Sequence, residues 1–396
     1  MEDAPLARRM TETARTFASF SRFQTESRAM RKAGQPGVSN FIFGNPQEMP
    51  QPGLVAAFQK WIVPQHKDWY AYIQSQPGAQ AAVAAGLRER LGVPFEPDDI
   101  TMTTGAFAGL TLALNAVVDP CDEVIFISPP WFFYEAIIVA SGGKPVRVKV
   151  DPQTFDLDLQ AIAASIGERT RAITVNSPNN PTGKIYPPQT LRELARILTA
   201  ASERTGRTIY LVSDEAYSHI VFDGRSFPSP ACFYPNTFLI YTYGKTLQIP
   251  GQRIGYIALP PEMPHREQVQ QGLFTAQVEA GYAYPNAMLQ YALPELEKLS
   301  VDIAGLQCRR DRLVRELRKM GYSVHMPEGT FYLLPRSPWS DDWAFVDRLA
   351  EREVLCLPGS VAEMPGYFRI SLTASDDMLE RALPGFRVAI SPDQQA

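Results

Sequence analysis

Short apolar runs that alternate with helical stretches constrain the fold of this chain more than any other feature. Each run is apolar almost throughout and rich in Val, Ile, Phe or Tyr, which is typical of strands that helices cover on both faces of a parallel sheet. This alternation predicts a doubly wound α/β fold. We expect strands at Glu123–Ser128, Arg171–Asn176, Ile209–Asp214, Phe238–Tyr243 and Ile254–Pro260, and helices at Ala79–Leu91 and Gln189–Ala201.

The pattern changes after about Leu293. Apolar residues at helical spacing among many Arg predict one long helix at Leu299–Met320. A chain of 396 residues also exceeds the size of one ordinary core. We therefore predict a large domain at 45–290 and a smaller domain built from 1–44 and 291–396.

Composition excludes several classes of protein. A net charge of −4 provides no basic surface for nucleic acid. The 4 cysteines are scattered without a CxxC pair, so neither a disulfide framework nor a metal site is expected. The N-terminus is polar, and no stretch approaches the ~18 apolar residues of a membrane span. We expect a cytoplasmic protein without a membrane or nucleic-acid partner.

Chemically distinctive residues follow the predicted strands, where open α/β sheets bind their ligands. Lys245 and Arg253 follow one run, and Asp214 ends the run before it. A partly desolvated lysine can attack a carbonyl carbon, and a buried carboxylate needs a cationic partner such as a protonated pyridine nitrogen. Taken singly, Lys245 is better explained as a solvated surface charge and Asp214 as a helix N-cap.

Three further segments add donors and a flat ring. The loop Asn176–Gly183 presents an Asn amide, and its Asn180–Pro181 bond is a candidate cis peptide. The turn Thr103–Ala108 opens a helix whose N–H groups suit a phosphate, although it lacks the G-x-G-x-x-G pattern of dinucleotide sites. The segment Ser128–Tyr134 holds an aromatic cluster, and one of its rings could stack on a heterocycle. Together these features match the needs of pyridoxal 5′-phosphate (PLP).

The segments NNPTG, DEAY and GKTLQIPGQRIGY resemble those of class I/II aminotransferases, the fold-type I PLP enzymes, and the resemblance runs from about Asn40 to Ser371. It implies a mostly parallel sheet sandwiched by helices in the large domain and a smaller α+β domain from both termini. It also implies that Lys245 is the Schiff-base lysine and proton carrier, and that Asp214 pairs with the pyridine nitrogen.

The resemblance assigns the remaining contacts of the cofactor. Tyr217 and Asn180 would hydrogen-bond the 3-oxygen of the ring, and Trp131 would stack on the ring. Tyr72, with Tyr70 as a competing match, would reach the phosphate of the neighbouring subunit in a homodimer. The phosphate would otherwise be held by Arg253, Thr242 and the backbone of Gly105, Ala106 and Phe107.

The same resemblance predicts the substrate contacts and the reaction. Arg369 within YFRIS would hold the substrate carboxylate, close to Gly44 and Asn180. The implied reaction moves an amino group from an L-amino acid to a 2-oxo acid through an imine on Lys245, with no metal. No catalytic role is expected for His66, His219, His265 or His325.

Other activities remain open at this stage. Gly244 before the lysine and the segment Pro358–Ser360 depart from the common family pattern, and both fall near the expected substrate. A PLP-dependent β-elimination lyase, decarboxylase or O₂-using oxidase is therefore the first alternative, because fold does not fix reaction. A sensor domain of a transcription regulator would need a basic DNA-binding part, and a nicotinamide dehydrogenase would need a glycine fingerprint.

Overall fold

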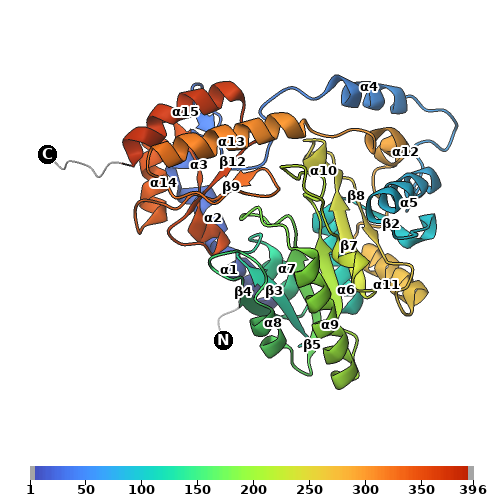
Figure 1. Ribbon diagram of the computed structural model, residues 1–396. Helices are drawn as coiled ribbons and strands as arrows, with labels where there is room; N and C mark the ends of the chain where they lie inside the picture. Colours follow the sequence, from blue (N-terminus) through green and yellow to red (C-terminus); the bar gives the residue numbers. More distant parts are fainter. Residues whose placement is uncertain (1–4, 391–396) are drawn as a thin grey trace.

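A seven-stranded sheet forms the centre of the computed structural model, which describes residues 5–390 (Figure 1). Its strand order is β2-β8-β7-β6-β5-β3-β4. Strand β8 runs antiparallel to both β2 and β7, and all the other neighbours are parallel. The predicted α/β fold with a mostly parallel sheet is therefore confirmed.

The elements have the following bounds. The strands are β1 (Ser39–Asn40), β2 (Ile100–Thr103), β3 (Glu123–Ser128), β4 (Lys144–Lys149), β5 (Thr170–Asn176), β6 (Tyr210–Asp214), β7 (Thr237–Thr242), β8 (Gly255–Ala258), β9 (Tyr332–Leu333), β10 (Val354–Leu355), β11 (Leu357–Pro358) and β12 (Phe368–Ser371). The helices are α1 (Arg8–Thr16), α2 (Ala18–Glu26), α3 (Arg28–Lys32), α4 (Pro52–Trp61), α5 (Pro77–Leu91), α6 (Ala106–Val117), α7 (Tyr134–Ala140), α8 (Leu159–Ser165), α9 (Pro188–Thr205), α10 (Tyr243–Thr246), α11 (Arg266–Glu279), α12 (Ala287–Leu296), α13 (Ile303–Lys319), α14 (Asp342–Glu351) and α15 (Asp376–Ala389). Short 3₁₀ turns lie at η1 (Pro97–Asp99), η2 (Pro230–Cys232) and η3 (Gly359–Ala362).

The uninterrupted apolar character of the strands follows from packing on both faces of the sheet. Along β3, Val124 and Phe126 belong to one hydrophobic cluster, while Ile125 and Ile127 belong to another. The first cluster includes side chains of α6, α7 and α11, and the second includes side chains of α8 and α9. Since helices bury both faces of β3, no position from Val124 to Ile127 favours a polar residue.

Several predicted boundaries move by a few residues, and two of them move for local reasons that the structure shows. Strand β7 ends at Thr242 and not at Tyr243, because the Thr242 hydroxyl accepts a hydrogen bond from Gly244 N and so caps α10. Helix α13 begins at Ile303 and not at Leu299, because the Asp302 carboxylate caps it by accepting from Gly305 N. Side chains at the first turn thus set both boundaries.

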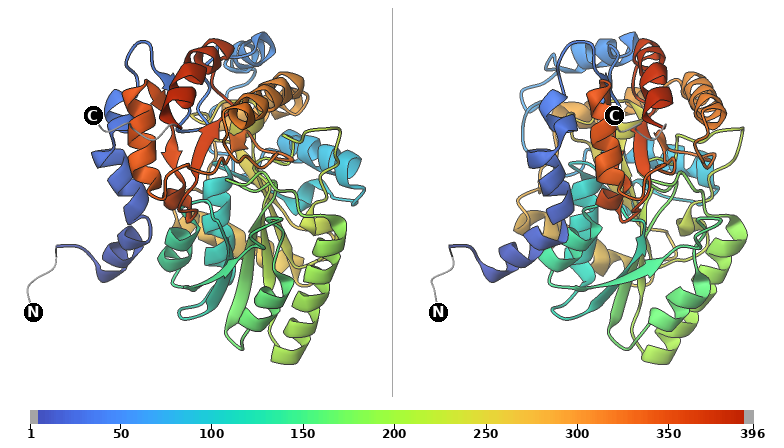
Figure 2. Two further views of the ribbon diagram at one scale, coloured as in Figure 1. Left: turned by 60° about the vertical axis from the view of Figure 1, so that its left-hand side comes forward. Right: turned by 90° about the vertical axis from the view of Figure 1, so that its left-hand side faces the viewer.

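The first and last parts of the chain pack together beside the central sheet (Figure 2). Strand β1 pairs in parallel with β10, and the antiparallel sheet β11-β12-β9 lies in the same region with α13, α14 and α15. This arrangement agrees with a small domain from both termini, although its boundaries at 44 and 291 stay a prediction. Residues 1–4 and 391–396 of that domain lie outside the described residues. Between residues 5 and 390, no helix has both the length and the apolar character needed to cross a membrane.

Candidate active site

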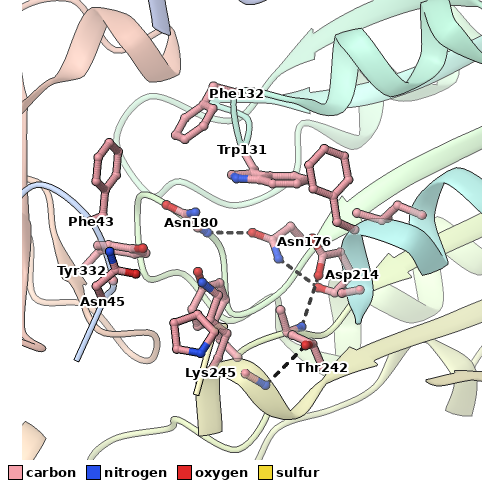
Figure 3. Close-up of a pocket in the computed structure, with 18 of the residues that line it drawn as sticks. Phe43, Asn45, Trp131, Phe132, Asn176, Asn180, Asp214, Thr242, Lys245 and Tyr332 are labelled. Atoms are coloured by element: carbon pink, nitrogen blue, oxygen red, sulfur yellow. Dashed lines mark hydrogen bonds between the residues drawn. The ribbon is translucent and has the colours of Figure 1, made fainter. Parts of the chain in front are cut away.

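A cavity of about 200 Å³ lies where strands β5, β6 and β7 end (Figure 3). It is also bordered by residues from the first and last parts of the chain. Most of the predicted site residues line it: Gly44, Ala106, Phe107, Trp131, Asn180, Asp214, Tyr217, Thr242, Lys245, Arg253 and Arg369. The structure thus brings together side chains that the sequence separates by hundreds of positions.

Asn176, at the end of β5, connects two of the predicted residues. Its side-chain NH₂ donates to the backbone oxygen of Asp214 at 2.9 Å, and its oxygen accepts from Asn180 N at 2.7 Å (Figure 3). These bonds fix the loop after β5 to the end of β6. The Asn180–Pro181 bond in this loop is cis, as the sequence suggests. Sequence analysis assigned Asn176 no role, because one Asn among several in a turn carries no distinct signal.

The Asp214 carboxylate is buried at the end of β6. It accepts hydrogen bonds from the Tyr134 hydroxyl and from Ala216 N. Burial raises its pKa, because desolvation penalises the charged form more than these hydrogen bonds and the Lys245 charge favour it. Within residues 5–390 it forms no ion pair, so a cationic ring nitrogen would supply the partner that the carboxylate lacks.

Lys245 lies on α10, directly after β7. Its Nζ is 6.0 Å from the centre of the Tyr217 ring and 5.9 Å from that of Phe331. Among the described residues it has no hydrogen-bond or ion-pair partner, and it lines the cavity with Asp214. The amine is therefore available to a ligand carbonyl.

Gly105 builds a third corner of the site, at the start of α6. Its φ of 92° falls in the left-handed region that favours glycine. A Cβ on this residue would lie 2.8 Å from Arg253 Nη2 and 3.3 Å from Thr242 Oγ1, so the backbone, the guanidinium and the hydroxyl crowd together. The first N–H groups of a helix have no acceptor within the helix, and their combination with a guanidinium and a hydroxyl suits a phosphate.

Arg369 lies on β12 with only 2% of its surface exposed. Its Nη1 donates to Asn180 Oδ1 and its Nη2 to the backbone oxygen of Ile42, each at 3.0 Å. Its Nε has no partner among residues 5–390. A buried guanidinium with an unused donor beside the cavity suits a carboxylate ligand.

Tyr332, on β9, is a site residue that sequence analysis missed. Its ring centre lies 4.0 Å from the Arg369 guanidinium carbon. Burial favours the neutral phenol, but Arg369 and Lys245 outweigh that effect and lower the Tyr332 pKa below the usual value for tyrosine. A Cβ on Gly44 would lie 2.7 Å from the Tyr332 hydroxyl, so only glycine fits at position 44.

Tyr217 is buried beside these residues, and burial raises its pKa, followed in effect by the neighbouring Tyr332. Its ring meets those of Phe331 and Tyr332 edge to face, at 5.3 and 6.1 Å.

The segment around Tyr332 has the apolar pattern of an ordinary core strand, and for this reason the sequence does not predict a functional role for its phenol. A site tyrosine and a core tyrosine give the same sequence signal.

Tyr72 and Tyr70 lie outside the cavity. Tyr72 is 85% exposed and its ring centre is 4.9 Å from that of Tyr284, while the Tyr70 hydroxyl bonds to Ile62 O. Neither tyrosine reaches the cavity of its own chain, so the role of Tyr72 towards a neighbouring subunit stays a prediction.

None of the histidines of the described chain lines the cavity. In that part of the chain, no group of three or more His, Cys, Asp or Glu could hold a metal ion.

Known proteins match the chain over most of its length. The family model for aminotransferase class I and II matches residues 41–386. An aspartate/prephenate aminotransferase of Thermus thermophilus is 32% identical over 81% of this chain and 83% of its own length. An aspartate aminotransferase of Thermotoga maritima is 29% identical over 90% and 92%.

Solved structures agree with these matches. An amino transferase from Eubacterium rectale superposes with a TM-score of 0.88 and 27% identity over 98% of both chains. The N-succinyldiaminopimelate aminotransferase of Mycobacterium tuberculosis gives a TM-score of 0.84 and 27% identity, covering 97% of this chain and 100% of that one. The likeness therefore extends over both the central sheet and the terminal parts.

Proposed function

The chain belongs to the class I and II aminotransferase family and is a PLP-dependent aminotransferase, and we propose that PLP lies in the cavity around Lys245. One observation carries this proposal: an unpaired lysine, a buried carboxylate and a glycine–arginine corner converge on the ends of neighbouring strands. The raised pKa of Asp214 supports it, because a protonated ring nitrogen would relieve the cost of burying that charge.

Each part of the cofactor has a counterpart in the site. Arg253, Thr242 and the N–H groups of Gly105, Ala106 and Phe107 would bind the phosphate. Asp214 would hold the ring nitrogen protonated, and Trp131 would cover the face of the ring. Tyr217 and Asn180 would donate to the ring 3-oxygen. PLP bound there supplies a ring that stabilises negative charge at the substrate Cα.

Lys245 and Arg369 would act on the amino acid itself. Arg369 would hold the α-carboxylate, with Asn180 and the Gly44 backbone beside it. This contact would fix Cα relative to Lys245. The Nζ of Lys245 would accept the proton from Cα and would later return a proton to the carbon on the far side of the amino nitrogen. Substrate binding by Arg369 and proton transfer by Lys245 would thus involve side chains from different sides of one cavity.

The direct test is stoichiometry. Protein loaded with PLP is mixed with an amino acid and a 2-oxo acid, and all four acids are quantified. Amino group transfer predicts one new amino acid for each new 2-oxo acid. Ammonia, or a 2-oxo acid formed without its amino acid partner, would indicate an elimination or oxidase reaction at this site.

A homodimer is part of the same proposal. Tyr72 and Tyr284 form an exposed aromatic pair, and Ile62 and Val63 are 58% and 59% exposed. Such apolar surface suits a subunit interface. Light scattering should give twice the chain mass of 44.1 kDa.

We also propose a cytoplasmic location. The free thiols of Cys121, Cys232, Cys308 and Cys356 support it, and cell fractionation tests it.

A further inference from the structure

The cavity also has an aromatic lining to which the roles above assign no side-chain function. We define this lining, the aromatic wall, as the side chains of Phe43, Phe107 and Phe132, all of which line the cavity. Phe43 follows β1, Phe107 lies in the first turn of α6, and Phe132 lies between β3 and α7. Figure 3 shows Phe43 and Phe132 near each other, on the side where Tyr332 lies and away from Lys245.

Other rings hold this wall in place from behind. Phe20 stacks on Phe132 with ring centres 4.4 Å apart, and it meets Phe43 edge to face at 6.1 Å. Phe133 stacks against Phe107 at 5.5 Å and contacts Phe20 at 5.2 Å. Because each ring is packed against another, the wall is already formed and presents a large apolar surface at little conformational cost.

The cations that line the cavity itself all have roles assigned above. In the described part of the chain, the cations that line the cavity are Lys245, Arg253 and Arg369, and each is assigned above. A separate hollow behind Phe132 contains Arg147, which is paired with Glu135 and Glu363, and the exposed Arg15, which does not line the cavity. A second carboxylate on the substrate would therefore meet the aromatic wall without a cation from this chain, which is costly.

We propose that this site prefers an amino acid donor with an aromatic or large apolar side chain over a dicarboxylic one. The proposal rests on the assignment of Arg369 to the α-carboxylate, since that contact directs the side chain of the substrate towards Phe43 and Phe132. Aspartate, which appears in the names of several relatives, is the natural comparison. A phenylalanine ring would bury against the wall, whereas the aspartate side chain would find there no cation of this chain beyond those already assigned.

The first test compares donors on the wild-type holoenzyme. The rate of conversion of bound PLP to its amine form is followed by absorbance with phenylalanine, aspartate and alanine. We expect kcat/KM for phenylalanine to exceed that for aspartate by on the order of 100-fold. Aspartate reacting as well as phenylalanine would overturn the preference and leave the aminotransferase assignment intact. No reaction with any donor would overturn both.

The second test asks whether the wall is responsible. In Phe132→Ala, the ratio of kcat/KM for phenylalanine to that for alanine should fall about tenfold or more, because only the larger donor reaches the wall. Using a ratio within one variant cancels any loss of folded protein. Phe132→Leu, which keeps apolar bulk, should fall less.

A matched control removes a similar ring elsewhere. Phe233 is half-buried like Phe132, follows η2, and packs beneath Arg192 at 5.4 Å, away from the cavity. Phe233→Ala should leave the donor ratio at the wild-type value. An unchanged ratio in Phe132→Ala, or an equal fall in Phe233→Ala, would overturn the role of the wall. If Phe132→Ala does not fold, Phe43→Ala answers the same question.

Discussion

The two sides of the cavity are encoded in different ways. The strand-end side contains Asp214, which ends the buried strand β6, and Lys245, which lies just after β7, so a short stretch of sequence predicts both position and environment. The terminal side contains Arg369, Tyr332 and Phe43, and the Arg369–Ile42 hydrogen bond spans 327 positions. The residues proposed for the cofactor ring and for proton transfer therefore follow short local signals, while the proposed contacts to the substrate depend on packing between distant segments.

The largest expected effect is on the strand-end side. Lys245→Ala removes the proposed proton carrier and should lower turnover by on the order of 10⁴-fold or more. PLP should still bind through Arg253 and Asp214, which absorbance after dialysis would show. Lys319→Ala, at the exposed end of α13, is the control for loss of a lysine. Turnover near the wild-type level in Lys245→Ala would contradict the assignment.

The next effect belongs to the terminal side. Arg369→Ala should raise KM for the amino acid roughly 100-fold, about 3 kcal/mol, because a charge-assisted contact to the α-carboxylate is lost. Turnover at saturation should fall less. Arg369→Lys should recover only part of the affinity, since lysine lacks the forked geometry. Unchanged KM in the Ala variant, measured by steady-state kinetics, would remove Arg369 from the substrate site.

A third prediction concerns the buried acid beside Asp214. Glu215 is bonded to the hydroxyls of Ser229 and Ser213, at 2.6 and 3.0 Å, and burial raises its pKa from 4.5 to about 7. The folded state then holds this proton more tightly than the unfolded chain. Stability from this group is fully present below about pH 4.5 and is lost as pH rises through about 7, by about 3 kcal/mol.

Glu215→Gln should remove that part of the pH dependence. Urea unfolding at pH 5 and pH 8 measures it, and the difference between wild type and variant isolates the contribution of this one group. The wild type should lose more stability than the variant between the two values. Equal losses would show that Glu215 is ionised in the folded protein across the whole range.

The smallest expected effect separates Tyr332 from an ordinary core residue. The lowered pKa means that its phenol ionises at less alkaline pH than usual, and a phenolate beside Arg369 would compete with the substrate carboxylate. Tyr332→Phe should lower kcat/KM only about fivefold at neutral pH, about 1 kcal/mol. It should also extend activity to higher pH. If activity falls at the same alkaline pH in the variant and in the wild type, Tyr332 contributes only packing.

Sequence reasoning located most of the sheet because its strands carry a strong two-sided apolar signal. The bounds of β3 coincide with the predicted run, and β6 ends at Asp214 as expected. The direction of β8 could not be read, because an antiparallel strand covered on both faces has the same composition as a parallel one. The roles of the predicted site residues, like the domain boundaries, stay proposals.

The residues that sequence analysis missed could not be predicted because their local sequence patterns are not distinctive. Tyr332 and Phe132 lie in apolar or aromatic segments, where a residue that packs in the core and a residue that lines a cavity have the same local pattern. Asn176 acts through two hydrogen bonds whose partners are set by the cis-proline loop and by β6. Only the tertiary arrangement separates these residues from their neighbours.

The central claim is that Lys245 carries the cofactor. Borohydride reduction of the PLP-loaded protein, followed by proteolysis and mass spectrometry, tests it directly. The account predicts one pyridoxyl phosphate adduct, on the peptide that contains Lys245, and none at that position in Lys245→Ala. An adduct located on another lysine, with Lys245 unmodified, would contradict it.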